Sequence, residues 1–176
     1  MEISVKLGSA RTLKTACIAV AVHSGKRLSA CAQALDKASR GALSRVIKRG
    51  DISGNPGESL MLPDVGGISA ERVLLVGCGR QDGISGSEYQ RVLMTAAKAL
   101  CEAGVRTAAS ALLEVAVHDR DVAWQARQMA VAFNSARYRF DQLKSKPSRK
   151  PQLARLLVLS GASQSAAVEA GTRLGY

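Results

Sequence analysis

Aromatic residues are scarce in this sequence. Only 3% of the residues are Phe, Trp or Tyr, although 47% are hydrophobic. A core built mainly from Ala, Val and Leu suits helices that pack closely on a sheet. Nucleic-acid modules that stack bases on a platform of aromatic side chains need more aromatic residues than this chain has, which excludes that class.

Cysteine pairs and long apolar runs are also lacking. The four cysteines lie far apart among apolar neighbours, without a CxxC pair, so we expect buried, reduced thiols rather than a disulfide framework. No apolar run approaches the roughly 18 residues that a membrane span needs. The N-terminus, MEISVKLGSARTLKT, has no signal-peptide apolar core. We therefore expect a soluble, cytoplasmic protein with no membrane partner.

Catalytic and metal-binding patterns are absent from the sequence. His23 and His118 are isolated, and we expect each of them in a loop. There is no HExxH motif, no His/Cys cluster and no GxSxG around a serine. No two acidic residues share an otherwise apolar helix face, as a general acid/base pair would need. We therefore predict no catalytic, cofactor-binding or metal-binding residue in this chain.

The apolar pattern predicts an α/β fold. Continuous apolar runs are typical of strands covered on both faces, and apolar residues at steps of three and four indicate helices. The predicted strands span 3–7, 17–22, 58–62, 72–78, 107–113 and 153–159. The predicted helices span 28–46 with a break at Gly41, 85–104 with a Ser85–Glu88 capping box, 122–143 after an Asp121 cap, and a segment after Gly161.

Two glycine-containing loops are candidate ligand sites. In RGALSRVIKRGDISGNPGESLML, residues 40–62, GNPG is predicted to join a helix ending at Gly50 to a strand starting at Glu58. GCGRQDG, residues 77–83, lies where a dinucleotide loop would, but its GxGxxxG spacing is one residue too long. Neither loop continues into the Lys-Ser/Thr pair of a phosphate loop. We interpret both as turns, with small-ligand binding at GCGRQDG as the alternative.

Positive charge is in excess and unevenly distributed. The chain has 25 Lys and Arg against 14 Asp and Glu, a net charge of +11, and the stretch 137–155 alone has seven bases and one acid. This favours a polyanion or an acidic partner surface, whereas Pro147 and Pro151 favour a solvated linker. Both readings stay open. The possible DNA contacts are Arg45, Lys48, Arg49, Lys144, Lys146, Arg149 and Lys150.

Three strings together resemble one known family. LDKASRGALSRVIKRGDISGNPGES, RVLLVGCGR and SARYRFDQLKSK, in this order, are similar to the N-terminal domain of the leucyl (cytosol) aminopeptidases. The resemblance implies a mixed β-sheet sandwiched between helices, similar to macro domains. It also implies that 1–160 form a non-catalytic N-terminal α/β domain. Residues 161–176 would then begin the helix that connects to a catalytic domain absent from this chain.

The resemblance also implies a function for the parent protein. Its catalytic domain would hold two divalent metal ions (Mn or Zn) and remove N-terminal amino acids from peptides with metal-activated water. This chain alone would be inactive and free of cofactors, serving assembly or access to the active sites. Its partners would be its own catalytic domain and the other subunits of a hexamer. The alternatives are a DNA-binding module and a nucleotide or ADP-ribose binder of macro-domain type.

Overall fold

The computed structural model describes residues 1–142 and 153–175. Its described strands form a single sheet in the order β1-β7-β6-β2-β5-β4, with β3 paired to the end of β2. The strands are β1 (Glu2–Lys6), β2 (Cys17–His23), β3 (Arg27–Leu28), β4 (Ser59–Pro63), β5 (Arg72–Gly77), β6 (Thr107–Ser110) and β7 (Arg155–Leu159). The helices are α1 (Ala30–Ala38), α2 (Ala42–Arg49), α3 (Gly86–Ala103), α4 (Val122–Gln142) and α5 (Ser165–Leu174).

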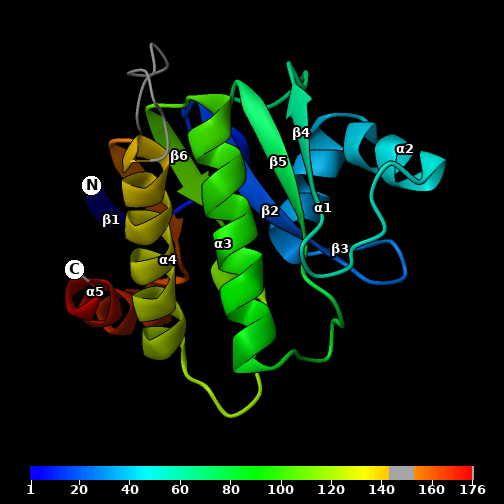
Figure 1. Ribbon diagram of the computed structural model, residues 1–176. Coiled ribbons are helices and arrows are strands. Elements are labelled where there is room, and N and C mark those ends of the chain that lie inside the picture. Colours follow the sequence, from blue (N-terminus) through cyan, green and yellow to red (C-terminus); the bar gives the residue numbers. More distant parts are fainter. Residues whose placement is uncertain (143–152, 176) are drawn as a thin grey trace.

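The sheet is mixed and covered on both faces, as predicted. Neighbouring strands from β1 to β5 run parallel, β4 runs antiparallel to β5, and β3 runs antiparallel to β2. α3 and α4 cover one face, with α5 beside α4, and α1 and α2 lie on the other side (Figure 1). This arrangement places the carboxyl ends of the parallel strands at one edge of the sheet.

The central strand β2 shows why its sequence is a continuous apolar run. Every residue of β2 is buried. Cys17, Ala19 and Ala21 belong to the core under α3 and α4, whereas Ile18, Val20 and Val22 belong to the core under α1 and α2. Because successive strand residues face opposite sides, a strand with helices on both faces needs apolar residues at every position.

The helices begin and end at the predicted signals. The Ser85–Glu88 capping box is present at α3, and the Asp121 carboxylate accepts the Trp124 backbone N–H at 2.7 Å. Gly41, in the left-handed region with φ of +80°, separates α1 from α2, so the interrupted stripe forms two helices. The strand predicted for 107–113 is too long, because the chain turns into a short 3-10 helix after Ser110.

α5 packs directly on α4. A Cβ on Gly171 would lie 2.2 Å from the Ala123 carbonyl oxygen, so the two helices approach at a distance that only glycine permits. Val168 on α5 is fully buried. The boundary at residue 160 stays a prediction. None of the described helices combines the length and the apolar character needed to cross a bilayer.

The predicted burial of the cysteines is confirmed, since all four are free and buried. Burial raises the pKa of Cys17 and Cys31 to about 12. Because the thiolate is the reactive form, we expect negligible reaction with Ellman's reagent at pH 8 in the native state. Unfolding in guanidinium chloride should release all four thiols. Rapid reaction of even one thiol per native chain would contradict this burial.

Candidate functional site

Two loops meet above the carboxyl ends of β2 and β5, where open α/β sheets commonly bind ligands. The Gly79 backbone N–H, in GCGRQDG, donates to the Gly54 carbonyl, in the loop containing GNPG, at 2.8 Å. A Cβ on Gly54 would lie 2.3 Å from the His23 carbonyl oxygen, and a Cβ on Gly77 would lie 2.1 Å from the Asn55 carbonyl oxygen. The backbone of the loops therefore fills the space directly above these strand ends.

The GNPG loop binds an internal anion. The Glu58 carboxylate oxygen Oε2 accepts the backbone N–H groups of Ser53, Gly54 and Asn55, at 2.8, 3.0 and 3.3 Å. Successive backbone N–H groups of this kind form the concavities that bind phosphate in other proteins. Since Glu58 already occupies these donors, the loop is a closed turn between Gly50 and β4, as predicted, with no free cradle for a phosphate.

Glu58 makes the folded state less stable as the pH falls into the acid range. Partial burial acts to raise the pKa of Glu58, but the three backbone N–H donors and the Asn55 side chain outweigh it and lower the pKa. The ionised carboxylate therefore stabilises the fold at a pH above its unfolded pKa of about 4.3, and this contribution is lost as the pH falls through the folded pKa.

Glu58→Gln should accordingly destabilise the chain at pH 7, with the difference from wild type shrinking below about pH 4. Urea unfolding at a series of pH values measures this difference. Glu169→Gln, at an exposed position of α5, is the matched control and should follow the wild-type profile. A Glu58→Gln difference that stays constant from pH 7 to pH 3 would contradict the assigned role of the carboxylate.

The two histidines have structural settings. His23 is the last residue of β2, not a loop residue as predicted, and it is only 4% exposed. Burial lowers the pKa of His23, and it outweighs the opposing effects of the hydrogen bond with the Gly79 backbone and of the Glu114 carboxylate. His118 lies in a loop, as predicted, with its ring against Gly83.

No group of three or more His, Cys, Asp or Glu that could hold a metal ion occurs within residues 1–142 and 153–175. The residues described here therefore do not fit the two-metal centre that the resemblance implies.

A second cavity, of about 530 Å³, lies at the carboxyl ends of β1, β6 and β7. The start of α1 forms one wall. There the Glu114 carboxylate accepts the Cys31 backbone N–H at 3.0 Å. The positive end of a helix dipole favours anions, and here the Glu114 carboxylate of the same chain is that anion. A phosphate entering this cavity would meet Glu114, so the geometry disfavours nucleotides.

A groove of about 930 Å³ lies between α2 and the end of β4, and we call it the α2–β4 groove. Ala42, Val46, Leu62 and Val65 form its apolar floor. Four bases and one acid, Asp64, also line it, and the bases are all exposed: Arg40, Arg45, Lys48 and Arg49. The groove is therefore apolar at its base and positive at its rim.

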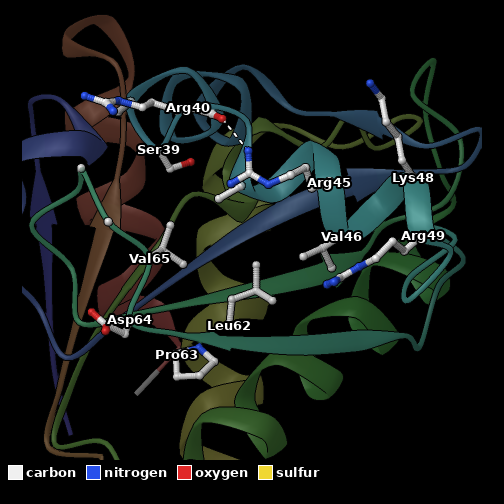
Figure 2. Close-up of a pocket in the computed structure, with 14 residues that line it drawn as sticks. Ser39, Arg40, Arg45, Val46, Lys48, Arg49, Leu62, Pro63, Asp64 and Val65 are labelled. Atoms are coloured by element: carbon white, nitrogen blue, oxygen red, sulfur yellow. Dashed lines mark hydrogen bonds between the residues drawn. The ribbon is translucent and has the colours of Figure 1, made fainter.

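Figure 2 shows how these side chains are oriented. Arg45 and Arg49, one helical turn apart on α2, flank Val46, and the Arg45 guanidinium donates to the Arg40 carbonyl at 2.7 Å. Arg49 forms an exposed ion pair with Asp51 at 3.2 Å. The Lys48 side chain extends away from Leu62 into solvent. Arg45 and Arg49 are therefore the two bases best placed to contact a molecule in the groove.

The structure brings together three of the residues proposed as DNA contacts. Arg45, Lys48 and Arg49 all line the α2–β4 groove. The other four lie outside the described residues: Lys144, Lys146, Arg149 and Lys150. Sequence reasoning missed Arg40, which joins the groove because the chain turns there in the left-handed region with φ of +54°. It also missed the floor, because Leu62 and Val65 reach α2 only through the tertiary fold.

Comparison with known proteins gives consistent results. Residues 19–147 match the sequence model of the N-terminal domain of the cytosol aminopeptidase family. A probable cytosol aminopeptidase of Halorhodospira halophila is 42% identical over 153 residues, which are 86% of this chain but only 31% of that protein. The chain thus spans about a third of the length of this relative.

Two solved structures show the same fold. Tomato leucine aminopeptidase matches with a TM-score of 0.70 at 21% identity, over 97% of this chain and 35% of that one. The macro domain of ganglioside induced differentiation associated protein 2 matches with a TM-score of 0.73 at 6% identity, over 99% and 84%. The predicted macro-domain-like architecture is confirmed. Since the family description covers most of the chain, this protein belongs to the cytosol aminopeptidase family, of which it represents the N-terminal domain.

Proposed function

We propose that this chain is the non-catalytic N-terminal domain of a larger aminopeptidase. The observation that carries the proposal is the 42% identity to a relative of which the chain covers only 31%. Over the described residues, no cluster of metal-binding side chains occurs, although the family resemblance implies two metal ions. The chemistry is therefore assigned to the part of the protein that this chain does not cover.

The proposed parent removes N-terminal amino acids from peptides in the cytoplasm. Two divalent metal ions, Mn or Zn, would supply a Lewis acid and an activated water in its catalytic domain. The present domain would serve assembly of a hexamer or access of peptides to its active sites. Its doubly covered sheet and the tight packing of α5 on α4 support a role as a structural unit.

The reading frame beyond Tyr176 tests this proposal. We expect the natural gene to continue in frame into a metallopeptidase domain. If it does, deleting residues 1–160 from the longer protein should change its oligomeric state or its activity on long peptides relative to leucine p-nitroanilide. A stop codon directly after Tyr176 would contradict the proposal.

A second function, contact with polyanions, is favoured by the α2–β4 groove. Its rim carries four exposed bases against one lining acid, in a chain of net charge +11. Such contacts are strongly weakened by salt. Fluorescence anisotropy with a labelled DNA duplex at two salt concentrations tests it: no binding at low salt would end the DNA proposal. The nucleotide alternative has weaker support, because Glu114 occupies the helix end at the second cavity.

A further inference from the structure

We propose that the α2–β4 groove binds an acidic peptide segment in which apolar residues alternate with Asp or Glu. The inference rests on the second proposed function, contact with polyanions, and names the class of partner. Three observations carry it: two arginines that flank Val46, an apolar floor formed by residues of α2 and β4, and an internal carboxylate at the start of α2. Together they favour an acidic peptide over the other anions that a basic surface could bind.

The two arginines are placed at a cost to α2. Arg45 and Arg49 are four residues apart, so they lie on the same helix face, where like charges destabilise a helix. Asp51 offsets part of this repulsion through an exposed ion pair with Arg49. Both arginines flank Val46 (Figure 2). A carboxylate bound between them would relieve the repulsion, and guanidinium groups bind carboxylates in a bidentate manner.

The apolar floor of the groove favours a peptide ligand over a nucleic acid. Val46, Leu62 and Val65 point toward the middle of the groove and offer apolar contacts that a phosphodiester backbone cannot use (Figure 2). Among the described residues, no aromatic side chain lines the groove, so bases would find no described ring on which to stack. A peptide with alternating side chains can place apolar groups on this floor and carboxylates against the arginines, as extended peptides do in other recognition sites.

The start of α2 favours a peptide ligand over a free phosphate ion. The Asp36 carboxylate accepts the Ser44 backbone N–H at 2.9 Å and the Ser44 hydroxyl at 2.5 Å. This internal carboxylate already occupies the Ser44 N–H in the first turn of α2 and repels an isolated phosphate from this helix start. The anion-binding groups that are left are side chains spread along the groove, which suits an extended partner.

The edge of the sheet adds backbone groups beside the groove. β4 pairs with β5 on one side, with no described strand on the other. Because Gly77 donates to the Glu58 carbonyl and Asp64 donates to the Glu71 carbonyl, the antiparallel pattern turns the N–H and C=O of Met61 away from β5. An extended peptide on the Leu62 side of the groove could pair with them, as in strand addition to a sheet edge.

Anisotropy measurements with the 176-residue chain test the proposal. The probe is a short fluorescein-labelled peptide of alternating Glu and Leu, and the competitors are an oligoglutamate of equal length and a DNA duplex. We expect the alternating peptide to bind at low salt and to resist both competitors. Arg49→Ala should weaken binding by about threefold to tenfold, whereas Arg127→Ala, an exposed arginine on α4, should leave it unchanged.

Ala42→Glu supplies a variant that should stay folded. Residue 42 is the first of α2, where an acidic side chain is favourable to the helix, yet it lines the groove floor. We expect an unchanged melting temperature and at least tenfold weaker peptide binding. Equal affinity for oligoglutamate, or displacement by the duplex at equal charge, would overturn the peptide assignment while polyanion contact stands. Absence of binding by all three probes at low salt would overturn polyanion contact as well.

Discussion

Phe133→Ala is expected to lower the free energy of unfolding by about 3–5 kcal/mol. Phe133 is fully buried on α4, in the core that α3, α4 and the sheet share. The chain has only two phenylalanines, and its core otherwise consists largely of Ala, Val and Leu, whose small side chains leave few ways to refill the space. The cost therefore includes both the lost transfer free energy and a residual cavity.

Urea unfolding measures the Phe133→Ala effect as a shift of the midpoint at an unchanged slope. Val131→Ala is the control on the same helix. Val131 is 43% exposed, so its truncation should change stability by no more than about 0.5 kcal/mol. Equal losses for both variants would show that α4 does not present the assigned face to the sheet.

Gly77→Ala is expected to cost about 3 kcal/mol, by a different mechanism. A Cβ at residue 77 would lie 2.1 Å from the Asn55 carbonyl oxygen and 2.9 Å from its carbon. These are backbone atoms of a loop that Glu58 holds with three hydrogen bonds, so the loop cannot yield as a flexible side chain would. The added methyl group must therefore separate β5 from the GNPG loop.

Gly66→Ala is the matched control for Gly77→Ala. A Cβ on Gly66 would meet nothing within 4 Å. This substitution should be neutral or slightly stabilising, because alanine restricts the unfolded chain. Both variants are read by urea unfolding. A Gly77→Ala chain as stable as wild type would mean that the two loops do not interlock as described.

Much of the fold could be predicted from local patterns. The runs CIAVAV and RVLLVGC are typical of strands covered on both faces, and they form the centre of the sheet as β2 and β5. The capping box at Ser85 and the cap at Asp121 fixed two helix starts. These signals are local in sequence, which is why they can be interpreted without the structure.

The errors arise where tertiary contacts decide. His23 extends β2 because its backbone pairs with Arg27 of β3, a two-residue strand with no sequence signal of its own. The strand after Thr107 ends at Ser110, and the chain then turns into the short 3-10 helix Leu112–Glu114. For His23, a partner strand determines the backbone conformation.

The candidate site was only half predictable. The basic run RVIKR pointed to Arg45, Lys48 and Arg49, and all three line the α2–β4 groove. The apolar floor could not be predicted, because Leu62 and Val65 are far from α2 in sequence and meet it through the β4 edge. The floor is also the feature that distinguishes a peptide from DNA, so charge alone could not have identified the partner.

The hydrolysis of leucine p-nitroanilide by the purified 176-residue chain, with manganese added, tests the central claim most directly. A full-length cytosol aminopeptidase under the same conditions serves as the positive control. The chain should release p-nitroaniline at the rate of the buffer blank, because its described residues contain no metal-ligand cluster and its glycine loops are closed turns. Manganese-dependent hydrolysis above the blank would contradict the assignment of a non-catalytic domain.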